Sequence, residues 1–355
     1  MRMLKPTFLV HRRGHFRIRP FLLLLLVILT VAALLTHFQH SARANNPTWQ
    51  QFVYNGSAGS RPYVVYTPET YQVGTAVPLI VMLHGCAQTP LDFAIGTQMD
   101  QLAEQYHFIV AYPQQTSLYN PALCWNWFDP ANQFRGTGEP AIIAGIVQEI
   151  ESHTDRWTID RQRIYVTGIS AGGAMAVILG ATYPDVFAAI GVHSGVEYRA
   201  TTSLLGGGEV FLQGGPDPIQ QGQAAFAAME GFARVVPTIV FHGTRDMVAA
   251  PINGNQVVQQ WMETDFLASH GTYQADFHSP SRTIHGQVPD GNSYTVYSWN
   301  DNNGNEVQEY WLVNGMGHAW SGGNPSNFTD LQGPSASLAM YTFFKNHPMK
   351  DRVCE

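Results

Sequence analysis

Hydrophobic residues along the chain fall into short continuous runs that alternate with longer stretches of helical periodicity. A short continuous apolar run is typical of a strand that is buried on both faces. Strands that alternate with helices in this way predict a mostly parallel sheet covered by helices on both faces, which is an α/β fold. The strands expected on this basis are residues 79–83, 108–112, 164–167, 187–192, 238–241 and 310–313.

Other segments carry different patterns. Residues 61–67 alternate as an edge strand would, and residues 283–313 are typical of antiparallel hairpins near one edge of a sheet. The turn at 301–305, DNNGN, lacks the Gly and Glu spacing of a calcium-binding EF-hand loop, so we interpret it as a turn. Helices are expected over residues 93–106, over 139–153, and after the serine at position 170 through residue 183.

The first 44 residues differ from the rest of the chain. They hold seven Lys or Arg residues and no acidic residue, and an apolar run occupies positions 21–35. With Ala42-Arg43-Ala44 behind that run, the segment is typical of a secretory signal peptide cleaved after Ala44. An uncleaved signal anchor is the alternative, because the apolar run is only slightly shorter than a membrane span. In both cases we expect residues 45–355 to form one domain that is secreted, to the extracellular space or the periplasm.

The charge of residues 45–355 is strongly acidic. They contain 12 of the 19 Lys and Arg residues against all 26 Asp and Glu residues, which gives a net charge near −14. Without a cluster of Lys or Arg, such a surface has nothing to offset the repulsion of phosphate groups. This excludes nucleic acids and anionic membranes as partners and favours a neutral substrate. We expect a monomer.

One serine stands among residues with almost no side chain. The sequence Gly168-Ile169-Ser170-Ala171-Gly172 fits G-x-S-x-G, the nucleophile elbow, in which a strand turns sharply into a helix with Ser at the apex. A serine hydroxyl needs a base to become a nucleophile, and the base needs a carboxylate that fixes its tautomer.

Asp246 is the favoured carboxylate. It lies just past the carboxyl end of the expected strand 238–241, which is where open α/β sheets bind ligands. A turn Asp that caps the following segment is the alternative interpretation. Asp217 is the second candidate, but it lies in a Gly/Pro loop with no strand before it.

His318 is the favoured base. It follows the expected strand 310–313 closely, and it comes after the serine and the acid in the order Ser, Asp, His that this architecture uses. Three more histidines lie near strand ends, and we interpret them as residues that brace loops or form a pocket wall: His84, His193 and His242.

Backbone N–H groups are the expected source of an oxyanion hole. Ester hydrolysis places negative charge on the carbonyl oxygen, and N–H groups aimed at that oxygen stabilise it. The N–H of Ala171, directly after the serine, is one expected donor. The second is the N–H of Cys86 in the loop after strand 79–83, where Gly85 permits a close approach. A simple turn at Gly85 is the alternative.

Three cysteines are present, Cys86, Cys124 and Cys354. They are too far apart in sequence to indicate a metal site, and the chemistry above needs neither a metal nor an organic cofactor. An oxidising compartment permits one disulfide. We favour Cys86–Cys124, because both residues lie next to segments assigned to the site, and the bond would hold the loop that carries the Cys86 N–H.

Aromatic residues are candidates for a substrate-binding surface. Trp125 and Trp127 lie in the stretch CWNWF at 124–128, and Trp320 lies two residues after the candidate base. His84 is a further candidate for this surface. Ordinary packing in the core is the alternative for these aromatic residues.

Several blocks of the chain occur in an order and spacing that match one known family. They are PLIVMLHGCAQ (78–88), CWNWF (124–128), GISAGGAM (168–175), YPD (183–185) with HSG (193–195), and GHAWSGG (317–323). Over residues 50–345 the chain resembles the poly(3-hydroxybutyrate) depolymerase family of esterases. The resemblance implies an α/β-hydrolase fold with a single catalytic domain and a triad at Ser170, Asp246 and His318. It also implies a secreted enzyme that acts on short-chain hydroxyalkanoate esters.

One departure from the family pattern bears on the substrate. Members that attack solid polymer carry a linker and a polymer-binding domain after the catalytic domain, whereas this sequence ends about 37 residues after His318. We therefore expect no separate polymer-binding domain, and we favour soluble oligomers over crystalline polymer. The family is also similar to secreted acetyl xylan and feruloyl esterases, so esters of plant polysaccharide are the alternative substrate. A non-catalytic binding protein on a hydrolase scaffold is a second alternative, although all three triad positions carry competent residues.

Overall fold

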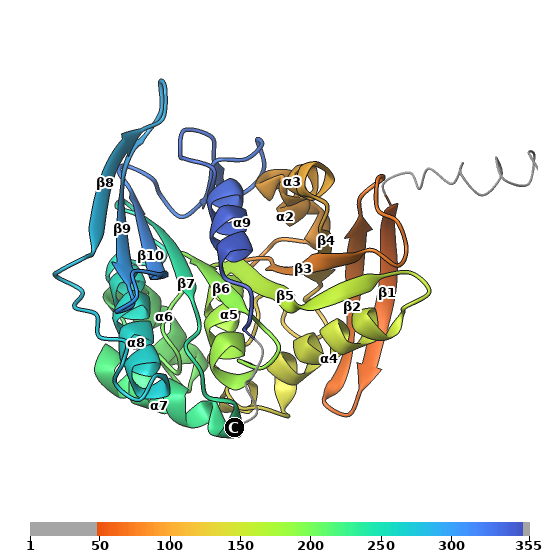
Figure 1. Cartoon of the computed structure of the whole chain (residues 1–355), viewed down its shortest axis with the longest axis horizontal. Coiled ribbons are helices and arrows are strands. Elements are labelled where there is room, and N and C mark those ends of the chain that lie inside the picture. The colour runs from red at the N-terminus through yellow and green to blue at the C-terminus, as the bar shows by residue number, and fades with distance from the viewer. Residues whose placement is uncertain (1–47, 351–355) are drawn as a thin grey trace, which may run out of the picture. The chain divides into compact units, whose positions relative to one another are not determined.

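A ten-stranded sheet with helices on both faces forms the centre of the protein (Figure 1). The computed structural model describes residues 48–350, so the expected leader at 1–44 and Cys354 lie outside the described residues. The strands of this sheet are β1 (Thr48–Gly56), β2 (Gly59–Thr67), β3 (Ala76–Leu83), β4 (Ile109–Pro113), β5 (Thr158–Ile169), β6 (Ala189–His193), β7 (Thr238–Gly243), β8 (Arg282–Gln287), β9 (Ser293–Asn300) and β10 (Glu306–Val313).

Eight α-helices accompany the sheet in the described part of the chain. They are α2 (Pro90–Thr97), α3 (Met99–Tyr106), α4 (Gly138–Ser152), α5 (Ala171–Thr182), α6 (Leu204–Gln213), α7 (Pro218–Ala228), α8 (Ile252–Ala268) and α9 (Ala336–Asn346). The short helices η1 (Pro130–Asn132) and η2 (Glu230–Phe232) and a small sheet of β11 (Trp320–Ser321) and β12 (Thr329–Asp330) complete these elements.

The middle of the large sheet is parallel and its edges are antiparallel. The order of the strands is β1-β2-β4-β3-β5-β6-β7-β10-β9-β8. Strands β4 to β10 in this order pair in parallel. Antiparallel pairing joins β1 and β2 to one edge and β9 and β8 to the other. The α/β architecture predicted from the sequence is confirmed, and so are the antiparallel hairpins near one edge.

The parallel strands are buried on both faces, which explains their continuous apolar runs. In β3, Leu79 and Val81 belong to one hydrophobic cluster, whereas Ile80 and Met82 belong to the other. Successive side chains of a strand point to opposite faces, so each strand needs apolar residues at every position to fill both clusters. Helices α4, α5 and α8 cover the first cluster, and α2, α3 and α9 cover the second.

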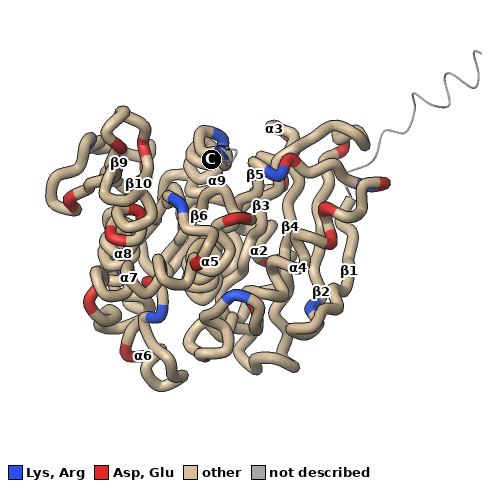
Figure 2. Tube along the Cα trace, turned by 60° about the horizontal axis from the view of Figure 1, so that its bottom comes forward, with Lys and Arg blue, Asp and Glu red and all other residues tan. Residues whose placement is uncertain are grey.

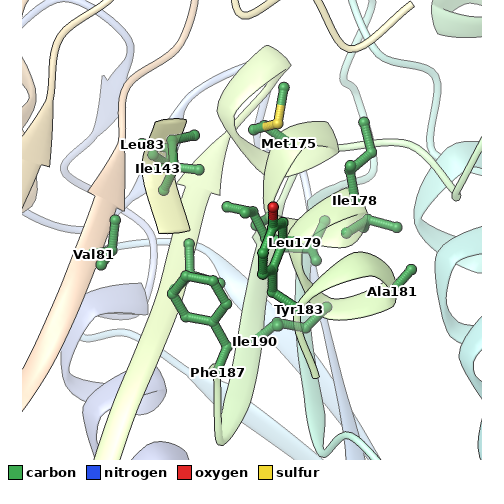
Figure 3. Close-up of a cluster of buried hydrophobic side chains, with 14 of the residues drawn as sticks. Val81, Leu83, Ile143, Met175, Ile178, Leu179, Ala181, Tyr183, Phe187 and Ile190 are labelled. Carbon is green, nitrogen blue, oxygen red and sulfur yellow. The ribbon is translucent and has the colours of Figure 1, made fainter. Parts of the chain in front are cut away.

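Helix α5 fills the centre of the first cluster. All of its 12 residues are buried, so it has no polar face to present to water. Figure 3 shows Met175, Ile178 and Leu179 of this helix in one cluster with Val81 of β3 and Ile190 of β6. The helix that carries the elbow is therefore fixed on several sides by packed side chains.

Residues 61–67 do not form an edge strand. They form β2, which lies one position inside the sheet, because β1 pairs along the whole length of its outer side. The sequence of β1 gives a weak signal, since its inward-facing Phe52 and Tyr54 alternate with Gln51 and an exposed Val53. Phe52 stacks on Tyr63 of β2 at 5.3 Å between ring centroids, which seats the added strand.

The single helix expected over residues 93–106 is two helices. The chain breaks at Gln98, which has a left-handed conformation with φ of 56° and closes α2 by donating its N–H to the carbonyl of Ala94. The carbonyl of Gly96 accepts the N–H of Asn324, 3.0 Å away, from the segment after β11. A contact with a distant segment therefore takes an oxygen that a continuous helix would use.

The turn at residues 301–305 is confirmed. Asp301 accepts the backbone N–H groups of Asn303 and Asn305 through one carboxylate oxygen, at 2.9 Å each. Figure 2 shows that charged residues of both signs are spread along the chain trace. Within residues 48–350, no helix combines the length and the apolar composition that crossing a bilayer requires.

Shortening Ile190 should test the packing around α5. Ile190 is fully buried in the first cluster, so Ile190→Ala is expected to lower the free energy of unfolding by about 2–5 kcal/mol, since it leaves a cavity. The matched control is Ile284→Ala on the edge strand β8, where the side chain is 41% exposed and the expected loss is within about 0.5 kcal/mol. Urea denaturation followed by circular dichroism measures both. Equal losses at the two positions would contradict the described burial.

Candidate active site

Ser170 lies at the apex of the turn between β5 and α5. Its backbone has φ of 57° and ψ of −121°, a conformation that is rarely adopted by residues other than glycine. The N–H of Ser170 donates to the carbonyl of His193 at the end of β6, at 2.9 Å. This is the strained strand-to-helix turn that the G-x-S-x-G pattern predicts.

The two glycines of the motif are required by the approach of β3. A Cβ atom on Gly168 would lie 2.5 Å from the carbonyl oxygen of Leu83, and one on Gly172 would lie 2.1 Å from the same oxygen. Both distances are far shorter than any real contact of a Cβ atom. The strand before Ser170 and the helix after it therefore press against the end of β3, and only glycine fits at either position.

The structure brings the predicted acid and base into contact. Asp246 follows β7 and His318 follows β10, and these strands are neighbours whose carboxyl ends lie at the same edge of the sheet. The Nδ1 atom of His318 lies 2.8 Å from Oδ2 of Asp246. Because a carboxylate can only accept, Nδ1 carries the proton and Nε2 is left as the acceptor.

The loop after β7 holds Asp246 as a carboxylate. Its second oxygen accepts the N–H groups of Val248 and Ala249 at 3.0 and 2.8 Å. Burial alone raises the pKa of Asp246, but the hydrogen bond from His318 and these loop contacts outweigh burial and hold the pKa below its usual value. The acid is therefore ionised beside the imidazole.

Ser170 and His318 line one apolar cavity of about 410 Å³. The loop at 84–88 forms one side of this cavity, and α6 forms part of another. The remaining lining residues among those described are Gly85, Cys86, Ala87, Gln88, Cys124, Trp127, Phe128, Ile169, Leu204, Gly207, Gly208, Phe211, Val248 and Phe328.

The two expected oxyanion donors are available at this cavity. Within the described chain, neither the N–H of Cys86 nor that of Ala171 has a hydrogen-bond acceptor. Ala171 is the first residue of α5, where backbone N–H groups have no partner within the helix and the helix dipole favours negative charge. Cys86 lines the cavity directly.

A family model described as esterase PHB depolymerase matches residues 61–277, which is more than half of the chain. The chain belongs to this family. It is similar in sequence to poly(3-hydroxyalkanoate) depolymerase C of Paucimonas lemoignei, with 35% identity over 68% of this chain and 54% of that protein. The chain thus matches about half the length of that relative.

Two other classes of esterase are also similar to this member of the family. Probable acetylxylan esterase A of Neosartorya fischeri is 30% identical over 73% of this chain and 68% of that protein. Feruloyl esterase B of Neurospora crassa is 30% identical over 57% of this chain and 71% of that protein. The solved acetyl xylan esterase from Aspergillus awamori superposes with a TM-score of 0.66 over 84% of this chain and 99% of that chain, at 23% identity. That likeness shows the α/β-hydrolase fold.

A disulfide and several hydrogen bonds brace the loop at 84–88 in this family member. The predicted bond between Cys86 and Cys124 is confirmed, with a sulfur–sulfur distance of 2.00 Å. The N–H of Ala87 donates to the carbonyl of Ala122 at 2.9 Å. Gln88 accepts the N–H of Gly85 at 2.9 Å through its side chain. These contacts fix the peptide that presents the Cys86 N–H.

His84 and Trp125 support this loop from behind and do not line the cavity. The Nε2 atom of His84 accepts the N–H of Gln115 at 3.0 Å, and its Nδ1 donates to the carbonyl of Gly85 at 2.8 Å. Burial lowers the pKa of His84 to about 4, so the ring is neutral. Trp125 donates from its indole to the carbonyl of His84 at 3.1 Å. The structure thus favours bracing for His84 and packing for Trp125.

Of the three tryptophans predicted to bind substrate, only Trp127 lines the cavity. Its ring packs edge-on against Phe211 of α6, with 5.2 Å between ring centroids. The expectation of a pocket wall at Trp320 is not met. Its ring is buried in the second cluster, edge-on to Phe93, and its indole N–H donates to Ser337 of α9 at 3.1 Å. Closeness to the base along the chain was misleading, because β11 turns the side chain into the core.

His193 joins the two loops that carry the candidate nucleophile and base. Its carbonyl accepts the N–H of Ser170, and its ring Nε2 accepts the N–H of Ser321 at 3.0 Å. The ring also stacks on Trp320 at 5.0 Å. Burial lowers the pKa of His193 well below its ordinary value, so the ring stays a neutral acceptor.

His242 and Asp217 have structural roles. The Nε2 atom of His242 donates to the carbonyl of Ala249 at 2.8 Å and lies 3.6 Å from Asp246, so it holds the acid loop closed. Asp217 caps α7 by accepting the N–H of Ile219 at 2.9 Å. It is not brought to His318.

A buried ion pair that the sequence did not indicate holds the stretch 124–128. Arg61 of β2 pairs with Glu139 of α4 at 2.8 Å, and both side chains are 4% exposed. The second oxygen of Glu139 accepts the N–H of Asn126 at 2.7 Å. Gln115 donates to the carbonyl of Cys124 at 2.9 Å. No local pattern marks a contact between residues 78 positions apart.

Removing the disulfide should loosen the loop that carries the Cys86 N–H. The double variant Cys86→Ala/Cys124→Ala is expected to lose about 2–4 kcal/mol of unfolding free energy, since the bond closes a loop of 38 residues. We also expect kcat to fall because the donor is less fixed. Urea denaturation and steady-state kinetics measure the two effects. Dithiothreitol should reproduce them in the wild type and add nothing in the variant. A wild type that is insensitive to reduction would contradict this role.

Proposed function

We propose that the protein is a secreted serine esterase that cleaves carboxylic esters through an acyl-enzyme. The observation that carries the proposal is the hydrogen bond between His318 and Asp246 at a cavity that also contains Ser170. The strained elbow and the two free N–H groups beside it supply the remaining parts that this chemistry needs.

The geometry suggests how each residue acts. His318 Nε2 removes the proton of Ser170 Oγ as this oxygen attacks the ester carbonyl, and the N–H groups of Cys86 and Ala171 stabilise the oxyanion. The bond to the alcohol breaks, and the alcohol oxygen takes the proton from His318. A water molecule then loses a proton to His318 and attacks the acyl carbonyl. As the bond between the acyl group and Ser170 Oγ breaks, His318 returns that proton to Ser170 Oγ and the acid leaves. Asp246 stabilises the imidazolium at both stages.

Hydroxyalkanoate esters of the poly- or oligo(3-hydroxybutyrate) type are the proposed substrates. The family match and the similarity to poly(3-hydroxyalkanoate) depolymerase C support this choice. Acetylated or feruloylated plant polysaccharide is the second candidate, because an acetylxylan esterase and a feruloyl esterase are similar over much of the chain. A non-catalytic role is disfavoured, because Ser170 and His318 line one cavity and Asp246 is hydrogen-bonded to His318.

The disulfide supports the proposal that the protein works outside the cytoplasm. Disulfides persist in oxidising compartments, and this one lies at the proposed site. The basic and apolar leader at 1–44 supports the same proposal. We further propose that the protein acts as a monomer.

Ser170→Ala should abolish ester hydrolysis. Purified protein is offered soluble 3-hydroxybutyrate oligomers, acetylated xylan and methyl ferulate, and released acid is measured for each. We expect selective cleavage of the oligomers by the wild type and only background release by the variant. A fluorophosphonate should label the wild type and not Ser170→Ala. Release of acetate or ferulate instead would favour the polysaccharide esterases, and an inert, unlabelled wild type would favour the binding protein.

Asp246→Asn should lower kcat by roughly 10³–10⁴-fold, because an amide facing Nδ1 of His318 favours the wrong tautomer of the ring. Asp217→Asn is the control, since Asn caps a helix as well as Asp and α7 should be unaffected. Initial rates on a soluble ester, together with thermal melts of both variants, provide the comparison. If Asp217→Asn caused the larger loss, the acid would be misassigned.

A further inference from the structure

The cavity beside Ser170 offers almost nothing to a polar group. None of its lining residues in the described chain is Asp, Glu, Lys or Arg. Apart from Ser170 and His318, two lining side chains of the described chain can form strong hydrogen bonds, Gln88 and Trp127 with its indole N–H. The oxygen of Gln88 already accepts the N–H of Gly85, and its nitrogen donates to the carbonyl of Asn327 at 3.2 Å. Beyond Ser170 and His318, the several hydroxyls of a sugar placed here would lose their water and find one available side-chain donor, the indole N–H of Trp127.

The cavity is also much larger than an acetyl group requires. Its volume of about 410 Å³ lies within the range of pockets that enclose entire small molecules. An acetyl group contributes only two carbon atoms, so most of the apolar wall would remain uncovered. A larger apolar group would cover the aromatic side chains Trp127, Phe128 and Phe211 and gain affinity from burying this surface.

Helix α6 leaves this space open by means of glycine. Leu204, Gly207, Gly208 and Phe211 line the cavity, and their spacing along the chain places them on one face of the helix. A Cβ atom on Gly207 would meet the ring of Trp127 at 3.5 Å, whereas one on Gly208 would meet nothing within 4 Å. Glycine is unfavourable inside a helix, so two glycines on the face that lines the cavity indicate that the open space serves to bind a ligand.

We infer that this cavity binds an apolar group larger than acetyl on one side of the scissile ester, and that Gly208 is a residue that determines its size. The group is an alkyl chain of several carbons or an aromatic ring, which share the chemistry that the walls can recognise. The inference rests on the proposed ester hydrolysis and narrows it. It disfavours acetylated polysaccharide, whose acyl group is small and whose alcohol is a sugar.

Two series of simple esters test whether the cavity binds the acyl group or the alcohol group of the scissile ester. The full-length protein is assayed with methyl esters of acetic, butyric, hexanoic and 3-phenylpropanoic acids, and with acetate esters of methanol, hexanol and 2-phenylethanol. In one series kcat/KM should rise by about threefold to fourfold for each added methylene that becomes buried. Within each series, the kcat/KM of the six-carbon member compared with that of the phenyl member shows whether the cavity prefers an alkyl chain or an aromatic ring.

Gly208→Leu should narrow the cavity from the side of α6. The ratio of kcat/KM for the hexanoyl or phenyl member to that for methyl acetate is expected to fall roughly tenfold or more. Gly231→Leu is the matched control, because this exposed glycine of η2 also has nothing within 4 Å of a Cβ atom and lies outside the lining. Its ratio should equal that of the wild type.

The outcomes distinguish this inference from the proposed function. Ser170-dependent hydrolysis in which methyl acetate is the best substrate overturns the inference and leaves the esterase intact. A preference for large groups that Gly208→Leu does not reduce, or that Gly231→Leu reduces equally, overturns the role of Gly208. If no ester is cleaved and Ser170→Ala behaves like the wild type, the proposed function fails and the inference fails with it.

Discussion

The carbonyl oxygen of Leu83 occupies the space that a side chain on Gly168 or Gly172 would need, and the rest of the site depends on this contact. It places the start of α5 directly against the end of β3. The loop at 84–88 begins at the very next residue, so the candidate nucleophile and the candidate oxyanion donor are positioned by one interface. Backbone meets backbone directly at this interface, because both positions are glycine.

Buried histidines stabilise this arrangement by staying neutral. His84 joins the loop after β3 to the segment after β4, and His193 joins the turn at Ser170 to the segment after His318. Each ring accepts a backbone N–H through Nε2, which a protonated ring could not do. Burial lowers the pKa of both residues, so these acceptors persist over the ordinary pH range. Buried charge is instead found at Asp246 and at the pair of Arg61 and Glu139, where hydrogen bonds satisfy it.

Much of this organisation could be predicted because it is local in sequence. The parallel strands follow from continuous apolar runs, and Ser170, Asp246 and His318 each follow a strand directly. The features that could not be predicted depend on distant segments. The helix expected over 93–106 ends at Gln98, where the carbonyl of Gly96 accepts the N–H of the distant Asn324. Strand β1 pairs with β2 at the edge of the sheet, although its own hydrophobic pattern indicates a strand only weakly. The inward turn of Trp320 depends in the same way on its contacts with α9 and α2.

Strand β10 separates the part of the sheet that positions the candidate site from the part that does not contact it. Among the described residues, none between Val248 and His318 lines the cavity. Strands β8 and β9 attach to the outer edge of β10, while its inner edge keeps register with β7. The hairpin of β8 and β9 is therefore a place where new surface can evolve at little cost to the chemistry. A longer hairpin there could change what the protein adheres to while the positions of Asp246 and His318 stay the same.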